Sequence, residues 1–343
     1  RRVLFRSAKP HVGTDILKDV VKNIRKQIIA LGGEVRFSSK LEYIKSKDGK
    51  IRSIIVNGEE IPCDALVLAL GHSSRDTYEM LNDIGIFMEP KAFAIGVRIE
   101  HPQEMINVGQ YGKMTSHPRL QAASYNLTYQ SKSLGRGIYS FCMCPGGVVV
   151  AAASEENRLV SNGMSYHARD KENSNSALVV TVAPDDFEGN SVLRGMEFQR
   201  YYEGLAYKVG GGGYKAPVQL LGDFINDRKS TKLGAVTPSY EPGFEFADMR
   251  QCLPSYVVDA IKEGVGNFDR KIKGYGREDA ILTGIETRTS APVKITRNER
   301  LESISLSGLY PCGEGAGFAG GIVSAAVDGI KVAERIIEKY YYS

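Results

Sequence analysis

A glycine-rich segment near the C-terminus has the residue types and spacing of an anion-binding turn. Residues 313–322 read Gly-Glu-Gly-Ala-Gly-Phe-Ala-Gly-Gly-Ile. A short apolar segment precedes them and an amphipathic segment follows, which predicts a strand, a glycine turn and a helix. In that order, free backbone N–H groups and the positive end of the helix converge where glycines let a phosphate approach. Glu314 is suited to accept a hydrogen bond from a ribose or ribitol hydroxyl.

A second glycine turn follows an apolar segment in the first third of the chain. Residues 65–70 read as a strand that is buried on both faces. The strand ends at Ala69 and Leu70 and runs into Gly71 and His72. Glycine there lets the backbone come close to a ligand, although a strand can end at a glycine without one. A histidine at this place can move protons, but a helix-capping or simply exposed histidine is the more common outcome.

Two further residues are candidates for chemistry. Cys144, in Phe-Cys-Met-Cys-Pro-Gly-Gly at 141–147, either faces a bound cofactor or substrate or is a small buried residue. Arg288 either holds a carboxylate or the electron-rich edge of a cofactor, or forms a salt bridge with Glu286 or another acid. The five cysteines and five histidines lack the spacing of known metal sites, so no metal is expected.

Composition limits the possible partners. The 343 residues carry a formal charge of +4, and no apolar run is long enough to cross a membrane. Residues 1–7, Arg-Arg-Val-Leu-Phe-Arg-Ser, can be encoded by the end of a common sequencing adapter, so we expect them to be an adapter scar. Without their three arginines, 41 basic residues face 40 acidic ones. Charge therefore favours neither a nucleic-acid nor a membrane partner, and the odd number of cysteines favours a cytoplasmic protein with reduced thiols.

The elements that must position these residues follow from periodicity and turn signals. We expect a first helix with Thr14 as its N-cap that ends at Gly32 and Gly33. A three-stranded meander, a buried strand and a helix should follow, at 34–37, 41–47, 51–56, 65–70 and 75–84. The middle of the chain predicts an antiparallel sheet with appended helices. Its strands are expected near 94–100, 138–142, 148–153 and 177–183, and its helices near 192–209 and 253–264.

This order of elements resembles a bacterial family of uncharacterised FAD-dependent dehydrogenases, also called NAD(FAD)-utilising dehydrogenases. Five stretches carry the resemblance, at residues 9–15, 69–77, 141–147, 284–292 and 313–322. The resemblance implies an α/β protein with a two-domain, glutathione-reductase-like flavoprotein fold. A discontinuous FAD-binding domain at 8–90 and 301–343 would be interrupted by a mainly antiparallel α+β substrate domain at 91–300.

The resemblance also implies a site and a reaction. FAD would be bound non-covalently and NAD(P)H is a possible electron donor, with a small-molecule substrate that the resemblance does not identify. Arg288, Cys144 and His72 are the catalytic candidates. The residues expected to contact the cofactor are Ala69, Gly71, His72, Gly313, Glu314, Gly315, Ala316, Gly317, Gly320, Gly321 and Ile322.

One feature of the family pattern is missing from the N-terminal region. No G-x-G-x-x-G fingerprint follows a first strand there. We therefore expect the chain to be a truncated fragment that lacks the first Rossmann unit, keeps the flavin-side contacts and has reduced activity or FAD affinity. Two alternatives remain: a flavoprotein that binds a macromolecule, as tRNA-modifying flavoproteins do, and a protein without catalytic activity.

Overall fold

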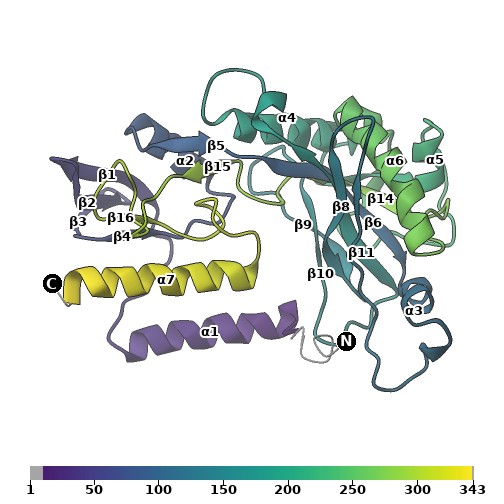
Figure 1. Ribbon diagram of the computed structural model, residues 1–343, viewed down its shortest axis with the longest axis horizontal. Helices are drawn as coiled ribbons and strands as arrows, with labels where there is room; N and C mark the ends of the chain where they lie inside the picture. Colours follow the sequence, from purple (N-terminus) through teal and green to yellow (C-terminus); the bar gives the residue numbers. More distant parts are fainter. Residues whose placement is uncertain (1–10, 342–343) are drawn as a thin grey trace. The chain divides into compact units, whose positions relative to one another are not determined.

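The computed structural model describes residues 11–341 of a mixed α/β protein (Figure 1). The predicted adapter scar at residues 1–7 lies outside the described residues. Packing contacts divide the chain into two units. Among the described residues, unit 1 comprises 11–35, 96–180 and 205–286, and unit 2 comprises 36–95, 181–204 and 287–341. The domain boundaries expected at 90/91 and 300/301 stay a prediction.

Unit 1 is built on a seven-stranded sheet. Its strands are β6 (Phe93–Pro102), β7 (Thr128–Gln130), β8 (Gly137–Cys144), β11 (Asn173–Val182), β12 (Ala216–Leu220), β13 (Phe244–Phe246) and β14 (Ile281–Glu286). They lie in the order β13-β12-β14-β6-β11-β8-β7. The pairs β12–β14, β14–β6, β11–β8 and β7–β8 are antiparallel and β12–β13 is parallel, which confirms the expected mainly antiparallel sheet. The central strand β6 is buried from Phe93 to His101, so both of its faces are covered.

Helices and a small hairpin complete unit 1. The helices are α1 (Thr14–Ala30), α3 (Gln103–Tyr111), α5 (Leu221–Ile225) and α6 (Ser255–Lys271), and α4 (Arg194–Val209) passes from unit 2 into unit 1. The hairpin joins β9 (Val148–Ala151) and β10 (Ser161–Met164). Helix α6 packs against β7 and β8 because Val257, Ile261, Val265 and Phe268 form one buried apolar face.

Unit 2 contains three small sheets and two helices of its own. An antiparallel meander joins β1 (Leu41–Lys47), β2 (Lys50–Val56) and β3 (Glu59–Pro62). The first turn is Asp48-Gly49, and both residues have positive φ, as a two-residue hairpin requires. The remaining elements are β4 (Leu66–Leu68) parallel to β16 (Leu309–Pro311), β5 (Met88–Pro90) antiparallel to β15 (Val293–Ile295), α2 (Arg75–Asp83) and α7 (Ile322–Tyr341). The apolar side chains of β4, β5, β15, β16 and α2 share one core cluster around Leu68, Tyr78, Leu81 and Leu309, whereas Val332 of α7 packs with Tyr310 and Cys312.

Three local predictions were wrong. Residues 34–37 form no strand, because the meander begins only at Leu41. Thr14 is the first helical residue rather than the N-cap, which is Gly13, and its hydroxyl bonds the backbone oxygen of Ser165 instead. Strand β4 is covered on one face only, since Leu68 is buried but Val67 is 42% exposed.

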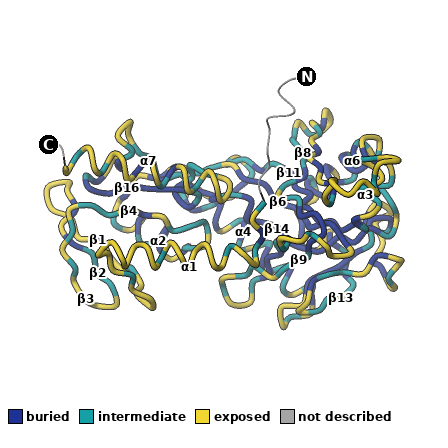
Figure 2. The backbone as a smooth tube through the Cα atoms, turned by 90° about the horizontal axis from the view of Figure 1, so that it is seen from below, coloured by how far each residue is buried: buried dark blue, intermediate teal, exposed yellow. Residues whose placement is uncertain are grey.

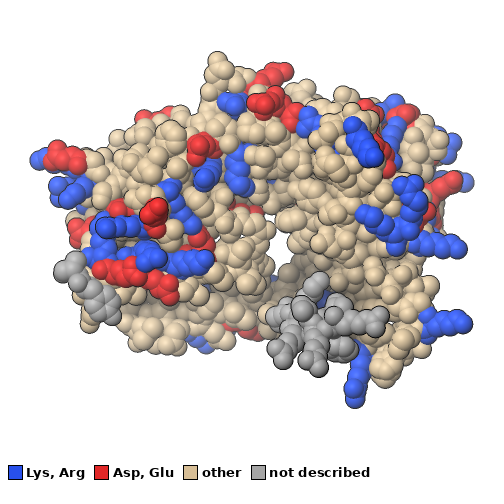
Figure 3. Space-filling view, in the orientation of Figure 1, with Lys and Arg blue, Asp and Glu red and all other residues tan. Residues whose placement is uncertain are grey.

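The first and last helices each present an uncovered apolar face. Helix α1 has no buried residue and α7 has only Asp328 and Val332 buried, so both are drawn largely in exposed colours in Figure 2. On α7, basic and acidic side chains are interspersed (Figure 3). Between residues 11 and 341, no helix has both the length and the apolar character that a membrane span needs.

Candidate functional sites

The two predicted glycine turns meet in unit 2. We call them the 69–72 turn, after β4, and the 313–321 turn, between β16 and α7. A Cβ on Gly315 would overlap the backbone oxygen of Gly71, so only glycine allows this approach. The Tyr78 hydroxyl of α2 fastens the contact by donating to the backbone oxygen of Gly315 at 2.8 Å. The two turns, which are separated by more than 240 residues in the sequence, are thus in direct contact.

The glycines of these turns have two different physical roles. Gly317 is required for packing, because an added Cβ would lie 2.9 Å from Lys294 Cα and its φ is +86°. Gly71 and Gly320, in contrast, have no atom within 4 Å of an added Cβ, and at Gly321 the nearest atom is 3.9 Å away. These three therefore leave open space where a ligand can approach the backbone.

An ion pair ties the 313–321 turn to the side of α7. Asp328 accepts a hydrogen bond from the Gly313 N–H at 2.8 Å and pairs with both terminal nitrogens of Arg297, at 2.6 and 2.9 Å. Arg297 also bonds the backbone oxygen of Pro311 at 2.9 Å. Together these bonds attach the end of β16 and the start of the 313–321 turn to the side of α7. The first N–H groups of α7 have no partner inside the helix and point toward the turn.

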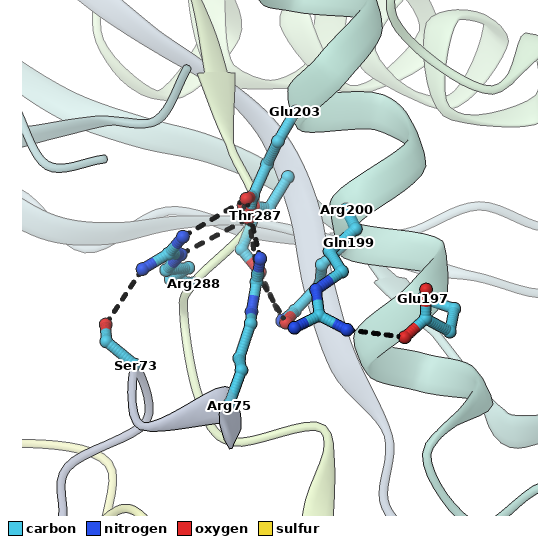
Figure 4. Close-up of polar contacts among 8 residues, drawn as sticks. All are labelled: Ser73, Arg75, Glu197, Gln199, Arg200, Glu203, Thr287 and Arg288. Atoms are coloured by element: carbon cyan, nitrogen blue, oxygen red, sulfur yellow. Dashed lines mark hydrogen bonds and ion pairs between the residues drawn. The ribbon is translucent and has the colours of Figure 1, made fainter. Parts of the chain in front are cut away.

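A buried cluster of opposite charges lies beside the 69–72 turn (Figure 4). Glu203 of α4 accepts from Arg75 at 2.7 and 2.9 Å and from Arg288 at 3.1 and 3.2 Å. Thr287 donates a further bond to it at 2.7 Å, and Arg288 also reaches the Ser73 hydroxyl at 2.9 Å. Burial alone would raise the pKa of Glu203, but the two guanidinium groups outweigh it and the pKa lies below its usual value. Two arginines and one glutamate leave one net positive charge.

Arg288 therefore forms a salt bridge with an acid, as one of its two interpretations predicted. The acid is Glu203 rather than Glu286, because Glu286 is paired with Arg98 on the neighbouring strand β6. Sequence spacing suggested Glu286, which is two residues away on the same segment. Residue 203 has no sequence signal that links it to either arginine, so only the folded chain identifies it.

His72 lies between this cluster and Glu314. Its Nδ1 is 3.8 Å from a carboxylate oxygen of Glu314. Burial, followed by the positive charges of Arg288 and Arg75, lowers the pKa of His72 to about 4. The imidazole is therefore neutral at pH 7, where it can exchange hydrogen bonds but is not a proton donor of the imidazolium type.

The other predicted contact residues occupy the same two turns. Ala69 is exposed and Ile322, the first residue of α7, is 72% exposed. Ala316 is buried, and its backbone oxygen accepts from Ile295 at 3.1 Å. This hydrogen bond thus attaches the 313–321 turn to strand β15. Their assignment to a cofactor stays a prediction.

The two cysteines of the 141–147 stretch lie in unit 1 and differ in exposure. Cys144, the predicted candidate, is buried, whereas Cys142 is exposed. Cys142 has φ +45°, a left-handed conformation that is uncommon outside glycine. The sequence does not distinguish the two thiols, and the exposed one, Cys142, was not among the predicted candidates. Within residues 11–341, no group of three histidine, cysteine or acidic side chains is placed to hold a metal ion.

Comparison with known proteins identifies relatives of the chain. A family model described as "FAD-dependent protein, C-terminal domain-like" matches residues 92–289. An uncharacterized protein of Clostridium beijerinckii is 73% identical over 333 residues, which cover 97% of this chain and 62% of the relative. The chain thus spans less than two thirds of that relative's length.

Two solved structures show a looser likeness. An oxidoreductase from Methanosarcina mazei is 13% identical, with 92% of this chain and 54% of that chain covered at a TM-score of 0.36. CtdE in complex with FAD is 11% identical, with 92% and 58% covered at a TM-score of 0.35. Likeness at this level does not define a shared fold.

Proposed function

Because the chain belongs to the family described as FAD-dependent protein, C-terminal domain-like, we propose that it is part of an FAD-dependent oxidoreductase. The family match covers more than half of the chain. We propose further that the flavin is bound non-covalently at the 69–72 and 313–321 turns. The observation that carries this proposal is the open space at Gly71, Gly320 and Gly321, on two turns that Gly315 holds together.

The residues around the two turns fit a flavin chemically. The N–H groups that begin α7 are suited to an electron-rich ring edge or a phosphate, and the Glu314 carboxylate is suited to a ribitol hydroxyl. The net positive charge of Arg75, Arg288 and Glu203 favours negative charge nearby. When bound, FAD accepts a hydride from a donor, for which we propose NAD(P)H, and passes the electrons to an acceptor.

An absorption spectrum tests this proposal. The purified chain and its longer C. beijerinckii relative are mixed with FAD, freed of excess ligand and scanned before and after NADH or NADPH is added. Bound flavin bands that bleach support both the cofactor and the donor. Bands that do not bleach support FAD and refute the nicotinamide donor. Colourless protein that takes up no FAD in either case overturns the assignment.

A further inference from the structure

A bulge in the sheet of unit 1 turns Cys142 outward. Phe141 pairs with Ala177 and Cys144 pairs with Asn175, so two residues of β8 face a single residue of β11. A bulge of this kind re-aims side chains and is common next to functional sites. With its positive φ, Cys142 is exposed while Cys144, two residues on, is buried.

The surroundings of Cys142 favour its thiolate form. The pKa of Cys142 is lowered to about 6. The hydrogen bond with the Cys144 thiol lowers it most and the Arg98 guanidinium lowers it further, whereas the partial loss of water around the Cys142 sulfur raises it. Arg98 is fully buried and donates to the backbone oxygen of Cys142 at 2.9 Å. The Cys144 sulfur lies 3.2 Å from the same oxygen. The two thiols and one cation therefore form a compact group at the end of β8.

An open pocket of about 450 Å³ lies over this group. Aromatic and apolar side chains supply much of its wall, and no acidic residue lines it; among its lining residues are Tyr125, Tyr139, Phe141, Cys142, Met143 and Arg169. Within residues 11–341 the Arg169 guanidinium has no hydrogen-bond or ion-pair partner, and its Nε is buried. A thiolate, an unpaired cation and apolar walls suit a small organic anion that contains a reactive sulfur.

We propose that Cys142 and Cys144 are a redox-active dithiol that reduces a small anionic disulfide bound in this pocket. The Cys142 thiolate attacks one substrate sulfur, the substrate S–S bond breaks and one thiolate leaves. Cys144 then gives up its proton and its sulfur attacks Cys142, which forms the Cys142–Cys144 disulfide and releases the second thiolate. The substrate gains two electrons and leaves as two thiolates, the dithiol loses those two electrons, and the single proton released comes from Cys144 and passes to solvent.

The order of attack follows from the environment of each thiol. The hydrogen bond with Cys142 and then burial raise the pKa of Cys144 well above its usual value, and the negative charge of Cys142 adds to this. Once Cys142 is bonded to substrate sulfur, that charge is gone, while Arg98 remains beside both residues. Cys144 then ionises more readily and is suited to be the resolving thiol.

The first test uses 5,5′-dithiobis(2-nitrobenzoate), an anionic aromatic disulfide, on the purified protein. We expect two rapid equivalents of released thiolate and a Cys142–Cys144 disulfide in peptide mass spectra. Cys144→Ser should release one rapid equivalent and keep the adduct on Cys142, and Cys142→Ser should lose the rapid phase. Cys63→Ser, at a half-buried cysteine outside the pocket, is the control and should behave as wild type. A wild-type protein that keeps a stable adduct on Cys142 and forms no internal disulfide would overturn the proposal without any variant.

The second test addresses the pocket. Arg169→Gln should slow the reaction with the anionic disulfide about tenfold, the usual order for one charge-assisted hydrogen bond. The same variant should react normally with uncharged bis(2-hydroxyethyl) disulfide. Equal slowing with both probes would argue against an anion site. Alkylation of Cys142 by iodoacetamide should rise with a midpoint near its pKa of about 6, and a midpoint at an ordinary thiol value would contradict the thiolate assignment.

Discussion

At the scale of single residues, one buried carboxylate organises the polar centre of unit 2. Glu203 is completely buried and compensates the charges of Arg75 and Arg288 at once (Figure 4). Removing one partner of a buried ion pair is costly because the remaining charge has lost both water and its counter-ion. A neutral residue in place of Glu203 would leave both Arg75 and Arg288 buried without their shared counter-ion.

We therefore expect Glu203→Gln to lower the free energy of unfolding by about 3–5 kcal/mol, measured by urea denaturation. Glu197→Gln is the matched control on the same helix, because the Glu197 side chain is 60% exposed and pairs only at the surface with Arg200. The control should change stability by less than about 0.5 kcal/mol. If the two substitutions lowered the free energy of unfolding equally, the buried ion pairs would contribute no more to stability than a surface pair does.

The pH dependence of the same variant provides a second readout. The folded-state pKa of Glu203 lies below the usual 4.5. Its ionised form therefore stabilises the fold above about pH 4.5, and this stability is lost as the pH falls through the lower folded value. Glu203→Gln should lose less stability than wild type between pH 6 and pH 3. A parallel decline of both proteins would contradict the assigned shift.

At the scale of elements, two strand–turn–helix segments are locked by a backbone contact. The 69–72 turn leads into α2, the 313–321 turn leads into α7, and Gly315 lets them touch. The contact depends on a missing side chain at Gly315, whereas Gly320 faces open space. The proposed flavin site therefore assigns stability to Gly315 and ligand binding to Gly320 of the same turn.

This separation predicts opposite phenotypes for two alanine substitutions. Gly315→Ala should lower the free energy of unfolding by about 1–3 kcal/mol, the usual cost of overpacking. Gly320→Ala should leave stability within about 0.5 kcal/mol and weaken FAD binding about tenfold, or ~1.4 kcal/mol. Urea denaturation and FAD titration measure the two effects. If Gly320→Ala binds FAD as wild type does, the flavin is not held against this turn.

At the scale of the whole molecule, the chain covers only part of its C. beijerinckii relative, and α1 and α7 each leave an apolar face uncovered. Patches of that kind commonly mark contact surfaces. The expected cofactor contacts of the described chain are those of the flavin end. A ligand that binds only the folded state stabilises it by RT ln(1 + L/Kd), where L is the ligand concentration, so the gain rises with the ratio of ligand concentration to dissociation constant.

We therefore expect riboflavin or FMN to raise the unfolding temperature of this chain about as much as FAD does. At 100 times the dissociation constant the gain should be about 2.7 kcal/mol. AMP, which lacks the flavin ring, is the control and should give no shift. Stabilisation by AMP and not by riboflavin, in differential scanning fluorimetry, would place the adenosine end rather than the flavin end on this chain.

Much of the secondary structure could be predicted from local sequence. The spacing of apolar residues predicted α2, α4, α6 and α7 to within a few residues at most of their ends, and Asp48-Gly49 predicted the hairpin of β1 and β2. These features depend on side-chain periodicity and turn conformation, which are properties of neighbouring residues. Two of the predictions that failed, the N-cap at Thr14 and the burial of both faces of β4, depend instead on contacts with distant parts of the chain.

The candidate sites, too, have features that local sequence predicts and features that depend on distant contacts. The sequence by itself determined that two glycine turns follow two short strands and that a Cys-Met-Cys pair ends another. Only the tertiary structure decided that Gly315 rests on Gly71, that Glu203 joins Arg75 to Arg288, and that Cys142 rather than Cys144 faces outward. The physical reason is that local spacing sets the conformation of a segment, whereas burial, ion pairing and thiol exposure arise from contacts between residues far apart in the chain.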